Sequence, residues 1–217
     1  MIRKLKRFSL FLFFSSLCLF ALQPAKSYSQ DTDKSERIKT LQEQIHKDRK
    51  FGNLEGEIHN RTRVIEINPD DGEAYYERGY AYMSQGSFDK AINDYSKAIY
   101  LKYQIEKSLY NRGAAYIQMG ENNKAKEDFD SSIEMNPTSD AYANRSTYYI
   151  LRKEYMSAVR DCNQAISLDD KNAKAYYNLG SSYAGMGDNR SAAKCIEQSC
   201  SLGYQRACDV MKQRFGK

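Results

Sequence analysis

Apolar and small residues in the middle of the chain recur at the spacing of an α-helix. Tyr75, Gly79 and Tyr82 stand at positions i, i+4 and i+7, which share one helical face. A second helical set runs over Ala91–Ile99, and Gly86 stands between the two sets. Glycine tolerates the positive φ of a tight turn. The pattern therefore predicts two helices joined by a short turn.

The same pattern returns three more times along the chain. Successive copies begin 34, 33 and 34 residues after the one before. The aligned first-helix motifs are Tyr75-Tyr76-Glu77-Arg78-Gly79, Leu109-Tyr110-Asn111-Arg112-Gly113, Tyr142-Ala143-Asn144-Arg145-Ser146 and Tyr176-Tyr177-Asn178-Leu179-Gly180. One hairpin cannot bury its own apolar face, so this repetition predicts a stack of hairpins.

The repeated unit resembles the tetratricopeptide repeat (TPR), which has an aromatic, Gly, aromatic, Ala, aromatic, Ala, Pro order. Pro137 occupies the closing proline position, whereas Tyr103, Asp170 and Tyr204 depart from it. The resemblance implies an all-α solenoid of antiparallel helical hairpins that follows a right-handed superhelix. The predicted repeats are residues 72–105, 106–138, 139–172 and 173–206.

Three further segments flank these repeats. Residues 38–71 have the length of one unit but carry Ile45 and Glu57 where small residues belong, so they predict a degenerate, TPR-like capping hairpin. Residues 28–37 show no apolar pattern and predict a flexible tether. Residues 207–217 predict a terminal capping helix with one apolar stripe.

The first 27 residues have the features of an export signal. A basic start is followed by the apolar run Phe8–Leu22, which is too short to cross a bilayer core as a helix. Small residues at Ala25 and Ser27 favour cleavage after Ser27, with Ser29 as the alternative site. An uncleaved anchor and a lipoprotein built on Cys18 are the competing interpretations. We expect an exported protein that is periplasmic, envelope-associated or secreted.

The charge balance argues against nucleic-acid binding. The formal net charge is +5, from 33 basic and 28 acidic residues. Five of the basic residues and none of the acidic ones lie in residues 1–27, so the remainder has 33 − 5 = 28 basic residues against 28 acidic ones. A neutral mature chain gives no overall electrostatic support for binding DNA or RNA.

Arginine and aspartate recur together in the first three repeats. The aspartates lie sixteen residues after the arginines, and the fourth repeat has Leu179 and Cys195 in their places. This joint presence and loss predicts one ion pair between the two helices of each hairpin. The alternative is a set of arginines that binds an anionic ligand. The predicted pairs are Arg78 with Asp94, Arg112 with Asp128, and Arg145 with Asp161.

The resemblance to TPR proteins implies that the first helix of each hairpin lines a concave groove. Tyrosine and asparagine are common at those positions, and both side chains suit contacts with an extended peptide. Alternatively, the tyrosines only fill space between helices. The predicted groove residues are Tyr76, Tyr80, Met83, Tyr110, Asn111, Asn144, Lys174, Tyr177 and Asn178, with Ala114, Ile117, Ala143, Thr147, Ile150 and Ser181 beside them. Only Asn144 and Lys174 match the clamp by which some TPR proteins hold chaperone C-termini, so that ligand is not expected.

The C-terminal run from Cys200 to Cys208 resembles the cysteine-bearing Sel-like repeats. That resemblance implies a disulfide between Cys200 and Cys208, which an oxidising compartment permits. We expect Cys162 and Cys195 to be free thiols, although a bond between them is the alternative pairing.

The sequence offers little material for catalysis or cofactor binding. Its two histidines, His46 and His59, match no metal-ligand spacing, and no glycine-rich phosphate loop is present. We therefore expect no enzyme activity, no cofactor and no metal. The favoured function is a scaffold or adaptor that binds a peptide segment of another protein. A self-assembling envelope component and an enzyme of unknown mechanism are the alternatives.

Overall fold

The computed structural model describes residues 23–215, and within them the chain is helical from α2 to α12 without strands. Most of the predicted leader, residues 1–22, lies outside the described residues. The described chain divides after Pro69 into two compact units, which are treated separately below. No helix in the described part of the chain is both long and apolar enough to cross a bilayer.

The first unit holds one hairpin of helices α2 (Gln23–Lys50) and α3 (Leu54–Ile67). Gly52 turns the chain between them with a φ of 66°. Asn53 caps α3 by accepting a hydrogen bond from the Gly56 amide at 3.1 Å. The predicted degenerate hairpin, residues 38–71, thus contains the second half of α2 and the whole of α3. Apolar side chains buried in this unit are Leu41, Ile45, Val64 and Ile65.

The prediction of a flexible tether over residues 28–37 is wrong, because these residues belong to α2. The segment lacks an apolar stripe, but an apolar stripe is needed for packing and not for helix formation. It contains no proline or glycine, and Asp33 and Arg37 approach to 3.9 Å at i, i+4 spacing.

A polar network replaces the Arg–Asp pair in this first hairpin. Asn60 donates to Asp48 Oδ2 at 2.8 Å, and Asn53 and Gln44 donate to Asp48 Oδ1 at 2.9 and 3.3 Å. Glu57 is likewise buried and lies 3.1 Å from Arg61 Nε. Of these interactions, the hydrogen bond from Asn60 to Asp48 joins α3 to α2.

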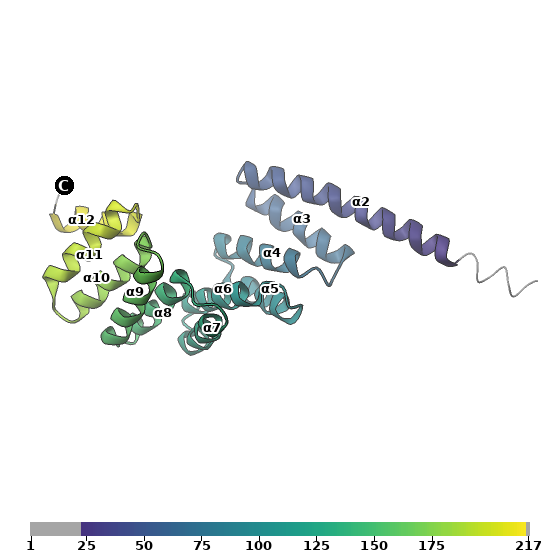
Figure 1. Ribbon diagram of the computed structural model, residues 1–217. Helices are drawn as coiled ribbons and strands as arrows, with labels where there is room; N and C mark the ends of the chain where they lie inside the picture. Colours follow the sequence, from purple (N-terminus) through teal and green to yellow (C-terminus); the bar gives the residue numbers. More distant parts are fainter. Residues whose placement is uncertain (1–22, 216–217) are drawn as a thin grey trace, which may run out of the picture. The chain divides into compact units, whose positions relative to one another are not determined.

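The second unit is a stack of four hairpins that ends in a single helix (Figure 1). Helices within a pair contact each other, and each second helix contacts the first helix of the next pair. The prediction of an all-α TPR solenoid is confirmed for this unit. Its pairs are α4 (Gly72–Gln85) with α5 (Phe88–Tyr100), α6 (Ile105–Gln118) with α7 (Asn122–Met135), α8 (Ser139–Leu151) with α9 (Tyr155–Leu168), and α10 (Ala173–Gly185) with α11 (Asn189–Ser201), before α12 (Gln205–Phe215).

Side-chain caps and left-handed turn residues set the ends of these helices. Asp71, Thr138 and Asn172 each accept a hydrogen bond from a backbone amide three residues later. Glycine with φ between 75° and 85° makes the turn inside three hairpins, at Gly86, Gly120 and Gly187. In the third hairpin Lys153 adopts φ 60° instead, which costs strain that glycine avoids.

The core of each hairpin matches a small residue on its first helix to a larger one on its second. A Cβ atom added to Gly113 would lie 2.7 Å from the Phe129 ring, and one added to Gly180 would lie 2.9 Å from Ile196. In the third hairpin the larger Ser146 takes the glycine position, and the residue that faces it is the smaller Cys162. Volume is thus conserved across the pair, as close packing requires.

Candidate functional site

Each of the first three TPR hairpins holds the Arg–Asp pair that the spacing predicts. In every pair Nε and Nη2 of the arginine donate to the two carboxylate oxygens, which is the bidentate geometry that favours arginine. The shortest contacts are 2.8 Å for Arg78–Asp94, 2.7 Å for Arg112–Asp128 and 2.8 Å for Arg145–Asp161. These pairs join the two helices of each hairpin.

The remaining guanidinium nitrogen is also used inside the protein. Arg112 Nη1 donates to Ser96 Oγ at 2.9 Å, and Arg145 Nη1 donates to Asp130 Oδ1 at 2.8 Å, both on the preceding hairpin. Hydrogen bonding to Asp161 raises the pKa of Arg145, although burial opposes this effect. The arginines therefore act as structural links, and their geometry does not support the alternative of an open anion site.

The predicted groove tyrosines divide into exposed and packed residues. Tyr80 is 57% exposed, whereas Tyr76 packs its ring 5.9 Å from both Tyr95 and Tyr103. Burial raises the pKa of Tyr110 to about 12, so this phenol stays neutral under ordinary conditions. Tyr76 and Tyr110 thus contact neighbouring helices while staying partly exposed, like Met83, and Tyr80 is the most accessible of the four.

The asparagines predicted to line the groove are largely used between hairpins. Asn111 donates to Tyr76 Oη at 3.1 Å. Asn178 Nδ2 lies 2.7 Å from the Ala143 carbonyl oxygen and 3.0 Å from Thr147 Oγ1. Because the Asn178 amide nitrogen is already hydrogen-bonded, it is not a free donor for a peptide. The amides hold successive first helices together.

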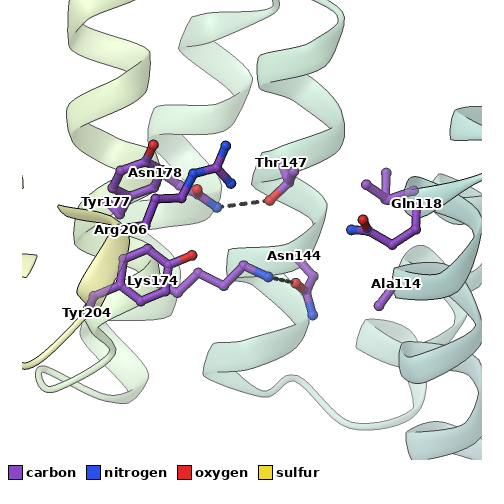
Figure 2. A pocket seen from close by; sticks show the side chains of 10 residues that line it. Ala114, Gln118, Asn144, Thr147, Lys174, Tyr177, Asn178, Tyr204 and Arg206 are labelled. Carbon is purple, nitrogen blue, oxygen red and sulfur yellow. Dashed lines mark hydrogen bonds between the residues drawn. The ribbon is translucent and has the colours of Figure 1, made fainter. Parts of the chain in front are cut away.

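A pocket of about 190 Å³ opens where three first helices meet the C-terminal turn. Figure 2 shows Ala114 and Gln118 of α6 on one side, Asn144 and Thr147 of α8 in the middle, and α10 with the terminal segment on the other side. Seven of the sequence-predicted groove positions meet here. The lining residues are Ala114, Ile117, Gln118, Asn144, Thr147, Lys174, Tyr177, Asn178, Tyr204 and Arg206.

Lys174 is the charged group at the centre of this pocket. Its Nζ donates to Asn144 Oδ1, and Figure 2 shows the side chain directed at that amide. Among the described residues Lys174 forms no ion pair, although the negative charge of Asp140 favours its protonated form. Burial is the larger effect and lowers the pKa of Lys174. An ammonium with an amide partner and no ion pair among the described residues suits an incoming anion.

Three lining residues were missed by the sequence analysis: Gln118, Tyr204 and Arg206. The ring of Tyr204 packs 5.2 Å from that of Tyr177, and the Arg206 guanidinium lies 5.5 Å from the Tyr177 ring centroid. A signal for Tyr204 was present in the sequence. Tyr103 and Tyr204 both replace the closing proline, and each stands 27 residues after the groove tyrosine on which it packs, Tyr76 or Tyr177.

The cysteines lie as the resemblance implied. The sulfur atoms of Cys200 and Cys208 are 2.02 Å apart, with 4.7 Å between their Cα atoms. Cys162 and Cys195 are free thiols. Burial raises the pKa of Cys162 to about 12, so its reactive thiolate form is scarce. Oxidation of Cys200 and Cys208 in the native protein remains a prediction.

Within residues 23–215 no cluster of three or more histidine, cysteine or acidic side chains is arranged to hold a metal ion.

Comparison with known proteins identifies the repeats. One tetratricopeptide-repeat profile matches residues 72–102 and 106–139, and a second matches residues 173–202. These segments fall on the first, second and fourth hairpins of the second unit. These three segments of the chain are thus tetratricopeptide repeats.

A curated plant protein is similar to this chain in sequence. The TPR repeat-containing thioredoxin TDX of Arabidopsis thaliana is 24% identical over 154 residues, which cover 70% of this chain and 32% of that protein. The chain therefore spans about a third of the length of this curated relative.

Solved structures resemble the chain over most of their length. MamA from Desulfovibrio magneticus RS-1 superposes with a TM-score of 0.68 at 18% identity, covering 76% of this chain and 94% of that one. YrrB, described as a TPR protein with an unusual peptide-binding site, superposes with a TM-score of 0.59 at 17% identity, covering 77% and 88%. At these identities the likeness shows the fold.

Proposed function

We propose that the chain is a non-catalytic scaffold that binds a segment of another protein across its first-helix face, meaning the face formed by α6, α8 and α10. The observation that carries the proposal is the pocket at Asn144, Lys174 and Tyr177, to which three successive hairpins contribute. A ligand that spans several hairpins needs an extended shape, and a peptide segment has that shape. The peptide-binding site attributed to YrrB, which has a similar fold, is in keeping with this function.

The chemistry of the pocket favours an acidic segment. Lys174 presents an ammonium that has no ion-pair partner in the part of the chain that the structure describes, and Arg206 adds a second cation at the rim. Ile117 and the ring of Tyr177 offer apolar surface beside them. A carboxylate that reached Lys174 would offset the cost of burying its charge, so binding an acid there is favourable.

The experiment is a peptide-array screen with the purified full chain. Arrays of acidic, neutral and basic decapeptides are probed with the wild type, Lys174→Met and Lys171→Met. Lys171 is exposed in the connection just before α10 and lies outside the pocket, so it controls for the loss of one positive charge. We expect the wild type to retain acidic peptides. Lys174→Met should weaken the binding of these peptides on the order of tenfold, and Lys171→Met should bind them about as well as the wild type. Peptide binding that Lys174→Met leaves unchanged, or no peptide binding at all, contradicts the proposal.

We also propose that the scaffold is exported. The basic start, the short apolar run and the small residues at Ala25 and Ser27 support this. Intact-mass measurement of the protein recovered from the cell envelope should show the loss of 27 or 29 residues. Recovery of the full-length chain in the membrane would contradict cleavage.

A further inference from the structure

The C-terminal turn forms one wall of the pocket. Tyr204 stands just before α12 and Arg206 is its second residue, and both line the pocket with Lys174 and Tyr177. Figure 2 shows their side chains on the same side of the pocket as α10, across from Gln118. This wall is built by the cap of the solenoid and not by one of its repeats.

Local contacts fix the path of this turn. Gly203 adopts φ 88°, and the Tyr204 amide donates to the Ser199 carbonyl oxygen at 3.1 Å. Ala207 is fully buried, which seats the start of α12 against α11. Cys200 and Cys208 bracket the turn, so a bond between them closes a loop that contains both pocket residues.

Arg206 is available to a ligand. It is exposed, and it forms no ion pair with any acid in the described part of the chain. Its guanidinium instead lies over the Tyr177 ring at 5.5 Å, which orients the group without neutralising it. Together with Lys174 it makes a site with two cations, one sheltered and one at the rim.

Building on the proposed function, we propose that Tyr204 and Arg206 form the second wall of the site that holds an acidic segment. The Cys200–Cys208 bond is the latch that keeps this wall in place, so ligand binding depends on the redox state of that pair. Opening the latch with dithiothreitol breaks the Sγ–Sγ bond. Each cysteine then gains a proton, and dithiothreitol is oxidised to its cyclic disulfide. With the latch open, the turn keeps its backbone hydrogen bonds, the buried Ala207 and the contacts with the Tyr177 ring, but it loses its covalent link.

The contribution of Arg206 is tested by fluorescence anisotropy with a fluorescein-labelled decaglutamate peptide and the oxidised full chain. Arg206→Gln should weaken binding about three- to fivefold, because an exposed charge contact contributes up to about 1 kcal/mol. Arg190→Gln is the matched control, since Arg190 is exposed on α11 outside the pocket. It should bind like the wild type.

The latch is tested in the same assay. Dithiothreitol should weaken peptide binding by the wild type at least threefold, about as much as the loss of Arg206, and should have no effect on Cys200→Ser/Cys208→Ser. Cys195→Ser, which alters a free thiol, should keep the wild-type response. Circular dichroism checks that the helices persist in every sample.

The outcomes separate this proposal from the proposed function. If the oxidised wild type does not bind decaglutamate, the proposed acidic ligand is wrong. If it binds, and reduction and Arg206→Gln leave the affinity unchanged, the cap is not part of the site and only the latch proposal is overturned.

Discussion

The guanidinium of Arg112 donates hydrogen bonds to both oxygens of the Asp128 carboxylate, at 2.8 and 2.7 Å, and thereby joins α6 to α7. Arg112 also contacts Ser96 on the preceding hairpin. Both charges are largely removed from water, so each depends on the other for its solvation.

Removing one partner of this pair should therefore cost more than replacing both. We expect Asp128→Ala to lower the free energy of unfolding by about 3 kcal/mol, because it leaves the Arg112 charge buried and unpaired. The double variant Arg112→Leu/Asp128→Cys copies the fourth hairpin, which has Leu179 and Cys195 at these positions, and should lose less. Urea unfolding of the single and double variants measures this. Additive losses would show that the pair is not coupled.

Close packing at Gly113 gives a second prediction. Alanine favours a helix more than glycine does, but its Cβ at position 113 would lie 2.7 Å from the Phe129 ring. We expect Gly113→Ala to lower the free energy of unfolding by about 1–3 kcal/mol through overpacking. Lys107→Ala, at an exposed site on the same helix, serves as the control and should have little effect. A gain in stability for Gly113→Ala would mean that this contact relaxes freely.

The partly buried positive charge of Lys174 should lower the free energy of unfolding of the wild type. Methionine fills similar space without an ammonium, and Asn144 keeps the Tyr110 hydroxyl as a partner. We expect Lys174→Met to raise the free energy of unfolding at pH 7 by about 1 kcal/mol. If Lys174→Met is at least as stable as the wild type but binds acidic peptides more weakly, Lys174 serves binding and not folding.

The pH dependence of this difference follows from the lowered pKa of Lys174. The destabilisation is fully present below the pKa of the folded state, and it fades as the pH rises towards the unfolded value of about 10.4. Urea unfolding between pH 7 and 10 should show the wild type approaching Lys174→Met. A constant or widening gap would contradict a sheltered ammonium.

Features that recur at the same position of each 34-residue repeat could be predicted from the sequence. Arg145 and Asp161 could be paired because the same types recur at the same offset in earlier copies and vanish together at Leu179 and Cys195. The Asp48 network with Asn60 could not be predicted in this way, because the degenerate hairpin has no second copy with which to compare it.

The pocket was predictable only in part. Asn144 and Lys174 follow from the first-helix register, but whether an amide faces a ligand or a neighbouring helix depends on packing that the register does not reveal. Asn178, for example, bonds to the Ala143 carbonyl oxygen. Arg206 lies beyond the last repeat, where the register ends, and only the fold of the terminal turn brings it beside Tyr177.

Photocrosslinking tests the central claim, that an acidic segment binds across the first-helix face, most directly. A benzoylphenylalanine at Gln118 lies in the pocket wall, and one at Glu127 lies on an exposed site of the second helix α7. Each variant is irradiated with the fluorescein-labelled decaglutamate peptide, with and without an excess of unlabelled peptide. The account predicts strong, competable labelling from Gln118 and background labelling from Glu127. Equal labelling at both positions, or labelling only from Glu127, would contradict it.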